Sequence, residues 1–167
     1  MMISDDVRRE ALREFTVAYR CQRAGELGQA IFHYKRSIEL IPTAEAHTFL
    51  GWAYSFQGRL DKAIQECRKA IDLDPSLGNP YNDIGAYLIE LGRPEDALVW
   101  LTRALKATRY ENHSYPWYNL GRAHELLGHR EEAHTRYQNS IDEDPAFTPA
   151  LLALKRLRDL SSITPED

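Results

Sequence analysis

This chain of 167 residues has few cysteines, no excess of basic over acidic residues and no long apolar run. Two cysteines, Cys21 and Cys67, are too few for a disulfide framework. Both occupy positions at which the helical pattern requires a core residue, so we expect buried, reduced thiols. The net charge is -4 and no basic stripe is visible, so we expect no nucleic-acid partner. No run of about 18 apolar residues occurs, and we therefore expect no insertion into a membrane.

The start of the chain, residues 1–6, is acidic and has no apolar stretch, so we do not expect a secretion signal. Without a signal the expected location is cytoplasmic, although a trimmed chain would look the same. No glycine-rich phosphate loop follows a predicted strand, and no nucleophile stands beside a base in a recognisable pattern. We therefore expect a protein that is not an enzyme, with no catalytic residues and no cofactor.

The histidines do not follow the spacing of a metal site. His124, His129 and His134 are five residues apart, whereas two ligands on one helix need spacings of about three or four. We expect a turn at Gly128 to separate His124 from the other two. The sequence therefore predicts no metal site.

Glycines, in contrast, recur through the chain with a regular period. The four glycines are separated by 33, 34 and 36 residues, and an alanine follows five residues after each of them. The glycines are Gly25, Gly58, Gly92 and Gly128, and the alanines are Ala30, Ala63, Ala97 and Ala133. A period of this size is typical of stacked helical hairpins. Apolar residues at three- and four-residue steps on both sides of each glycine predict two helices per unit.

Helix ends can be predicted from the residues around these turns. In the second unit we expect helices over about residues 44–57 and 61–72, with Asp61 as the N-cap of the second. Ser4 is expected to cap a helix that begins near Asp5, and Pro94 to stand at a helix start. A small residue stands seven positions before each turn glycine: Ala18, Gly51, Gly85 and Gly121. We expect these residues to allow two helices to approach, with Gly51 facing Ala63 and Gly121 facing Ala133.

Further residues complete a longer pattern in the second and fourth units. The second unit contains Leu50, Gly51, Tyr54, Gly58, Ala63, Ala70 and Pro75, and the fourth contains Trp117, Leu120, Gly121, Gly128, Ala133, Tyr137 and Pro145. On these residues the chain resembles the tetratricopeptide repeat family from about residue 11 to residue 145. The third unit departs from the pattern with Arg109 in place of proline, and the first departs with Val17, Ala18 and Cys21.

This resemblance implies an all-α fold, a right-handed superhelical α-solenoid of antiparallel helix pairs. We expect a single domain over residues 1–160, with a helix that begins at Thr148 or Pro149 and caps the last repeat. The expected repeats span about residues 11–43, 44–77, 78–113 and 114–147, the capping helix about 148–160, and a disordered tail 161–167.

By the same resemblance, the first helix of each pair lines a concave face. Formal charges on these helices are few: Glu45 within residues 44–57, and Asp83 and Glu90 within residues 78–91. A helix face that is poor in charge and rich in aromatic and amide side chains is typical of a contact surface. The predicted peptide-binding groove consists of Tyr19, Arg23, Trp52, Ser55, Asn79, Asn82, Tyr115, Tyr118, Asn119 and Arg122.

Two aromatic residues on the same helices have an alternative interpretation. Phe49 and Phe56 would either contact a ligand or pack against the neighbouring unit. Some family members hold a partner's terminal carboxylate with an asparagine and basic residues, at the positions that Phe49, Asn79 and Asp83 occupy here. These residues do not fit such a clamp.

The sequence therefore predicts a protein–protein interaction scaffold that binds a peptide segment of a partner in its concave groove. Alternatives are a self-assembling structural or oligomeric adaptor, for which the departures in the first unit would mark an open end, and a small chaperone of the secretion type. We expect a monomer or a weak homo-oligomer, and the chain could be a piece of a larger protein.

Overall fold

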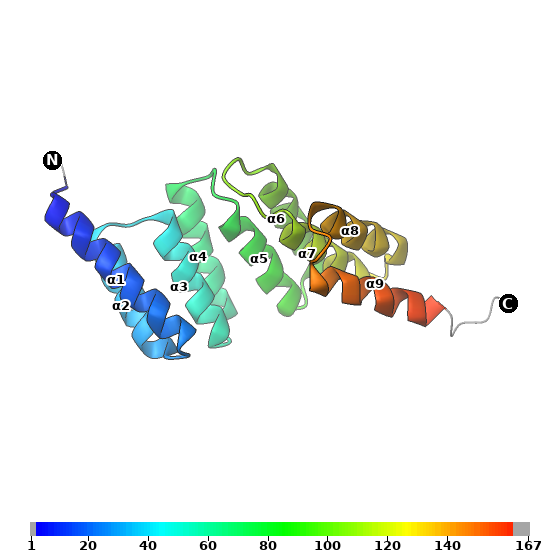
Figure 1. Cartoon of the computed structure of the whole chain (residues 1–167), viewed down its shortest axis with the longest axis horizontal. Helices are drawn as coiled ribbons and strands as arrows, with labels where there is room; N and C mark the ends of the chain where they lie inside the picture. Colours follow the sequence, from blue (N-terminus) through cyan, green and yellow to red (C-terminus); the bar gives the residue numbers. More distant parts are fainter. Residues whose placement is uncertain (1–2, 162–167) are drawn as a thin grey trace.

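The computed structural model describes residues 3–161, which form nine α-helices in a row (Figure 1). Their bounds are α1 Asp5–Arg23, α2 Leu27–Leu40, α3 Ala44–Phe56, α4 Leu60–Leu73, α5 Asn79–Glu90, α6 Pro94–Lys106, α7 Ser114–Leu126, α8 Arg130–Glu143 and α9 Thr148–Ser161. Within this part of the chain, β-pairing is limited to one isolated bridge between Leu77 and Arg109. The predicted all-α fold is confirmed.

Consecutive helices form four antiparallel pairs, and α9 follows the last pair at the C-terminal end (Figure 1). Each helix of a pair packs most closely on its partner, and the second helix of each pair also packs on the helix that follows it. The first helices α3, α5 and α7 also contact one another in series, as α1 and α3 do. The chain is therefore a superhelical solenoid in which the first helices form one continuous face.

The helix ends follow local sequence, with one exception. All four turn glycines have a positive φ, between 71° and 80°, which is the conformation expected just after a helix. The Ser4 side chain accepts a hydrogen bond from the amide of Val7, and Pro94 is the first residue of α6, as predicted. The prediction for Asp61 was wrong, because α4 begins at Leu60 after Arg59 and Asp61 already lies in its first turn.

The small residues before the turns face the second helix of their own pair. A Cβ on Gly51 would lie 3.0 Å from the carbonyl oxygen of Ala63, so the predicted contact is confirmed. Beside Gly121 the nearest atoms belong to the ring of Tyr137, 2.4 Å from where a Cβ would stand, and the contact of Gly121 with Ala133 stays a prediction. The space that a side chain would take at each glycine is therefore filled by atoms of the second helix of its pair.

The core divides into two main clusters along the row. The larger cluster extends from α1 to α7, and a smaller one joins Ala133 and Tyr137 of α8 to Phe147 and the inner face of α9. Helix α9 begins at Thr148, as predicted. The predicted disordered tail, 161–167, lies outside the described residues except for the last residue of that helix. Within residues 3–161, helices long and apolar enough to cross a bilayer are absent.

The two cysteines differ in burial. Cys67 is fully buried, and its burial raises the pKa of the thiol. Cys21 is half-buried and packs against the larger core cluster, so the prediction of full burial was wrong for this residue. On α2, the other helix of that pair, Tyr34 is fully buried at the position that Cys67 occupies in the second unit.

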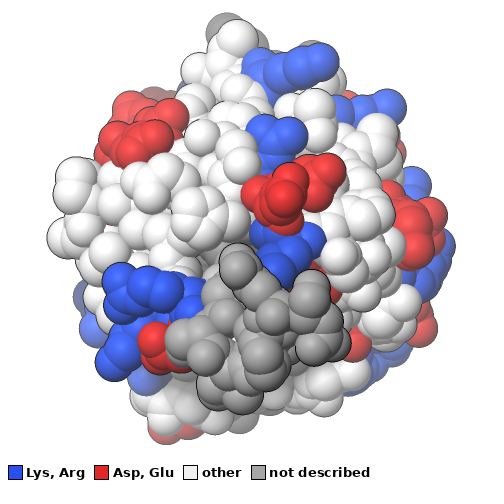
Figure 2. All heavy atoms as spheres, turned by 90° about the vertical axis from the view of Figure 1, so that its right-hand side faces the viewer, with Lys and Arg blue, Asp and Glu red and all other residues white. Residues whose placement is uncertain are grey.

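Charges of both signs are mixed on the C-terminal end of the molecule. Seen from that end, Lys and Arg lie beside Asp and Glu, with uncharged surface between them (Figure 2). On the described part of this face, neither sign of charge predominates.

Candidate functional site

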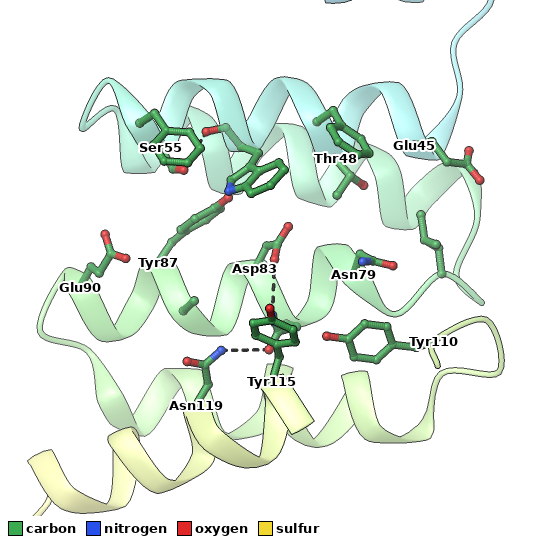
Figure 3. A pocket seen from close by; sticks show the side chains of 16 residues that line it. Glu45, Thr48, Ser55, Asn79, Asp83, Tyr87, Glu90, Tyr110, Tyr115 and Asn119 are labelled. Carbon is green, nitrogen blue, oxygen red and sulfur yellow. Dashed lines mark hydrogen bonds between the residues drawn. The ribbon is translucent and has the colours of Figure 1, made fainter. Parts of the chain in front are cut away.

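A groove of about 610 Å³ lies along the face formed by the first helices. Its walls come from α3, α5 and α7, together with residues that precede α5 and α7 (Figure 3). The lining consists of Glu45, Thr48, Phe49, Trp52, Ser55, Phe56, Leu77, Asn79, Asn82, Asp83, Ala86, Tyr87, Glu90, Tyr110, Tyr115 and Asn119. A volume of this size lies in the range of ordinary ligand pockets, about 300–1,000 Å³.

Helix α3 supplies an aromatic wall. Phe49, Trp52 and Phe56 are three and four residues apart, which places them on one face of the helix. Their rings contact in series, with centroids 5.8 Å apart for Phe49 and Trp52 and 5.6 Å apart for Trp52 and Phe56. Trp52 is 43% exposed and Phe56 59% exposed. This wall therefore presents unburied aromatic surface to the groove.

The floor of the groove is polar and comes from α5 and α7. Asn119 donates a hydrogen bond from Nδ2 to Oδ1 of Asn82, at 3.0 Å, and both side chains are buried. Arg122 in turn donates to Oδ1 of Asn119, at 3.1 Å. These two amides therefore bind each other and join α5 to α7.

Asp83 lies in the middle of the groove, with its carboxylate directed towards the space between α3 and α5 (Figure 3). Burial raises the pKa of Asp83 to about 7, and the amide of Asn82, 3.4 Å away, opposes this shift only weakly. Among the described residues that line the groove, Lys, Arg and His are absent. The carboxylate of Asp83 is thus a desolvated acid without a counterion.

Tyr87 follows Asp83 by one helical turn and lines the same groove. Its hydroxyl is buried and lacks a hydrogen-bond partner. The nearby hydroxyl of Ser55 donates instead to the carbonyl oxygen of Trp52, at 2.8 Å. Burial, together with the charge of Asp83, raises the pKa of Tyr87, so this phenol remains neutral and able to donate.

The last wall is formed by the segment between α6 and α7. The amide of Arg109 donates to the carbonyl oxygen of Ser76 at 2.9 Å, and the amide of Gly78 donates to that of Arg109 at 3.2 Å. This pairing folds the segment back onto the residues before α5. Tyr110 then packs on Gly78, where a Cβ would lie 2.2 Å from the Cβ of Tyr110, and its hydroxyl points towards the groove (Figure 3).

The guanidinium of Arg109 fixes the same segment from outside. It bonds to Glu45 at the start of α3, at 2.8 Å, and to Asp74 after α4. Arg109 stands where the repeat pattern asks for proline, so the departure in the third unit has a structural role. It also neutralises Glu45, which leaves Asp83 and Glu90 as the carboxylates of the groove without an ion pair.

Six of the predicted groove residues lie together in the lining: Trp52, Ser55, Asn79, Asn82, Tyr115 and Asn119. The other four, Tyr19, Arg23, Tyr118 and Arg122, lie outside it. The ring of Tyr19 packs on Phe49, with centroids 5.8 Å apart. The ring of Tyr118 packs on Tyr137 and Phe147, both at 5.7 Å, and so contributes to the C-terminal core cluster.

Other residues of the lining were left out of the predicted groove. Tyr87 could have been found from its spacing, because a residue four positions after Asp83 shares its helix face. Tyr110 had no such signal, because a long-range backbone pairing brings it to the groove. Phe49 and Phe56 had two alternative interpretations, contact with a ligand or packing on the neighbouring unit. Phe49 packs on Phe15, with ring centroids 5.3 Å apart, and also borders the groove, whereas Phe56 is largely exposed.

The turn at Gly128 does not separate the histidines beside it. It brings Nδ1 of His124 to 3.4 Å from Nδ1 of His129, contrary to the prediction. Burial, followed by the charges of Arg136 and His129, lowers the pKa of His124. Within the described part of the chain, groups of three or more side chains suited to a metal ion are not found.

Two segments of the chain match family models. Residues 44–77 and residues 115–138 both match the tetratricopeptide repeat. The chain is a tetratricopeptide repeat protein. The matched segments belong to the second and fourth units, whose sequences follow the repeat pattern most fully. Proteins of this family are generally non-enzymatic scaffolds for protein–protein interaction.

Curated relatives match this tetratricopeptide repeat protein over less than half of its length. The TPR repeat-containing thioredoxin TTL4 of Arabidopsis thaliana is 32% identical over 76 residues, which are 45% of this chain and 11% of the relative. The small glutamine-rich tetratricopeptide repeat-containing protein 2 of Mycosarcoma maydis is 33% identical over 76 residues, 45% of this chain and 22% of the relative. The matched region is thus a small part of each relative.

Solved structures share the fold over most of the chain. PilF of Pseudomonas aeruginosa superimposes with a TM-score of 0.86 at 21% identity, covering 95% of this chain and 72% of that one. PilW, a type IV pilus biogenesis factor, gives 0.83 at 22% identity, with coverage of 91% and 70%. MamA gives 0.72 at 22% identity, with coverage of 88% and 85%. These likenesses show the fold alone.

Proposed function

We propose that this protein is a non-enzymatic scaffold that binds an extended segment of a partner protein in the groove between α3, α5 and α7. The observation that carries the proposal is the aromatic wall of α3. Trp52 and Phe56 expose their rings side by side above a polar floor, in one groove of about 610 Å³. Aromatic rings that are exposed in the free protein and covered in a complex dominate many peptide interfaces.

The shape and chemistry of the groove suit an extended chain. Tyr115, 47% exposed on α7, stands opposite the α3 wall, so apolar side chains of a ligand can be buried from both sides. Burial of one such side chain contributes about 1.5–3 kcal/mol. Between the walls, the hydroxyls of Tyr87 and Tyr110 are neutral donors for ligand carbonyl groups.

A structural neighbour supports this mode of binding. The first TPR domain of RPAP3 (Spaghetti) was solved bound to the HSP90 peptide SRMEEVD. Its superposition on this protein has a TM-score of 0.65 at 22% identity and covers 71% of this chain and 93% of that one. The peptide of that complex is acidic, whereas the groove proposed here contains Asp83 and lacks a described cation. We therefore propose the same kind of ligand, a peptide segment, with a different sequence.

Selection from a display library of random peptides tests the proposal. We expect binders whose affinity, measured by calorimetry with the resynthesised peptides, falls about tenfold or more in Trp52→Ala, because the exposed indole loses its contact with the ligand. The melting temperature of the variant should stay close to that of the wild type, since Trp52 is 43% exposed.

Phe32→Ala is the matched control. Phe32 is 56% exposed on α2 and does not line the groove, so its truncation removes a similar aromatic surface without touching the site. Peptides that bind Trp52→Ala as tightly as the wild type, or a library that yields no binder, would contradict the proposal.

A further inference from the structure

The groove combines aromatic walls with uncompensated negative charge. Glu45 is paired with Arg109, but Asp83 and Glu90 form no ion pair with a described residue. Glu90 lies at the end of the groove opposite Glu45, and Asp83 lies between them (Figure 3). Above the raised pKa of Asp83, the charge of the empty groove is therefore negative at its centre as well as at Glu90.

Desolvation of the Asp83 carboxylate costs free energy, and the interactions within the empty groove do not offset this cost. A buried carboxylate is normally paired with a cation or bonded to several donors. The side chain of Asp83 has only the amide of Asn82, at 3.4 Å, which is near the limit of a hydrogen bond. The neighbouring hydroxyl of Tyr87 is likewise buried without a partner. Both groups lack a partner that a ligand could supply.

Aromatic rings next to a carboxylate form a site for an organic cation. The faces of Trp and Tyr rings attract ammonium and guanidinium groups, and the attraction grows when water is excluded. Trp52 and Tyr115 line the groove on the two sides of Asp83, from α3 and α7. The aliphatic part of a lysine or arginine would pack on these rings while its charged end reaches the carboxylate.

We propose that the groove holds a lysine or arginine side chain of the bound partner segment, with the carboxylate of Asp83 as counterion and Trp52 and Tyr115 as aromatic walls. This inference rests on the proposed function, and it defines the chemical class of the ligand: a basic peptide segment. Glu90, at one end of the groove, favours a second basic residue further along the same segment.

The proposal has a consequence for pH. A cation binds the ionised form of Asp83, whose pKa burial raises to about 7, so affinity should rise between pH 6 and pH 8. The titratable groups around Asp83 are Tyr87 and Glu90 on α5, Glu45 on α3, Cys67 on α4, Tyr115 on α7 and Tyr110 before α7. Burial raises the pKa of Tyr87, Tyr110 and Cys67, so these three stay neutral in that range.

The experiment uses the peptides selected from the random library on the full chain. We expect Trp52-dependent binders to share a lysine or arginine, and replacement of that residue by norleucine to weaken binding about tenfold to a hundredfold. In Asp83→Asn the peptide and its norleucine analogue should bind with similar affinity, and the rise between pH 6 and pH 8 should be lost. Rescue by Asp83→Glu would show that the charge is what the ligand requires.

Asp96→Asn is the control for net charge. Asp96 lies on α6, is exposed and does not line the groove, so this variant should keep the wild-type preference for the basic peptide. Trp52-dependent binders without a basic residue, or an unchanged preference in Asp83→Asn, would overturn the inference and leave the proposed function standing. A library without any Trp52-dependent binder would overturn both.

Discussion

Two carboxylates on adjacent helices, Glu66 of α4 and Asp83 of α5, show how the surroundings of an acid set its pKa. Glu66 is buried in α4 and bonds to Nδ1 of His47 at 2.6 Å and to Nζ of Lys69 at 2.7 Å. Burial by itself would raise the pKa of Glu66, but these two partners outweigh it and hold the pKa below its usual range. Asp83 is half-buried and has no such partners, so desolvation raises its pKa instead. Glu66 thus stabilises the folded chain through its partners, whereas the desolvation of Asp83 is not offset in the same way.

Glu66→Gln should lower the free energy of unfolding at pH 7 by about 1–3 kcal/mol, because a buried charged hydrogen bond is lost. Since the folded-state pKa of Glu66 is lowered, its contribution is complete above the ordinary glutamate pKa and is lost as pH falls through the folded-state value. Urea unfolding of wild type and variant from pH 7 to pH 3 should therefore show a difference that shrinks with acidity.

The exposed pair of Arg36 and Glu39 supplies the comparison. Glu39→Gln removes a surface partner at 3.3 Å and should cost less than about 1 kcal/mol at any of these pH values. A constant difference between wild type and Glu66→Gln across the pH range would show that the carboxylate charge is not what stabilises the pair.

Residue patterns predicted the fold well because each pattern reflects a local requirement. The turn glycines mark where a helix ends in the left-handed region, and all four have a positive φ. Local patterns did not predict which polar side chains form hydrogen bonds with one another. The hydroxyl of Tyr137 donates to Glu125 at 2.7 Å, and the amides of Asn82 and Asn119 bind each other, although each of these groups looks free in the sequence. Which polar side chain finds a partner depends on helices far apart in the chain.

At the scale of elements, the segment between α6 and α7 is the part that sequence reasoning could least predict. Its extra length was visible, but its path was not. The backbone pairing of Arg109 with Ser76 and Gly78 folds it against the residues before α5 and carries Tyr110 to the groove. The groove is therefore completed by a connection and not by a helix, which the repeat pattern alone does not describe.

Gly78→Ala tests this connection. A Cβ at Gly78 would lie 2.2 Å from the Cβ of Tyr110, so the two backbones would have to separate. We expect a loss of about 1–3 kcal/mol in the free energy of unfolding, as in other overpacked sites. Amide exchange of Arg109 should also accelerate, because its hydrogen bond to Ser76 depends on the same approach.

Gly28→Ala is the opposite case in the same protein. Gly28 lies in α2 with open space beside it, so alanine there should stabilise the protein by about 0.5–1 kcal/mol. If both substitutions proved neutral or stabilising, the packing of Tyr110 on Gly78 would not be a tight contact.

At the scale of the whole molecule, the row of pairs limits how far a perturbation can travel. Each pair contacts its neighbours along the row, and the stability of such an array is close to a sum of local terms. The departures in the first unit do not leave it loosely packed, since Ala18 is fully buried. At the other end, α9 covers a separate small cluster that includes Tyr137 and Phe147. The two ends should therefore respond independently.

Phe147→Ala makes that independence measurable. The ring of Phe147 is buried between α7 and α9 and contacts Tyr115 at 4.9 Å and Tyr118 at 5.7 Å, so its removal should cost the C-terminal cluster about 3–5 kcal/mol. Hydrogen exchange should accelerate in α8 and α9 while α1 to α4 keep their protection, because the contacts of Phe147 do not reach them.

Leu152→Ala, on the exposed side of α9, should leave exchange in α8 nearly unchanged, since Leu152 is 60% exposed. A uniform loss of protection from α1 to α9 in Phe147→Ala would mean that the array unfolds as one cooperative unit. In that case the groove could not keep its α3 and α5 walls when the C-terminal end opens. Retained protection in α3 and α5, with weaker peptide binding, would instead assign the loss to Tyr115, the groove residue that Phe147 supports.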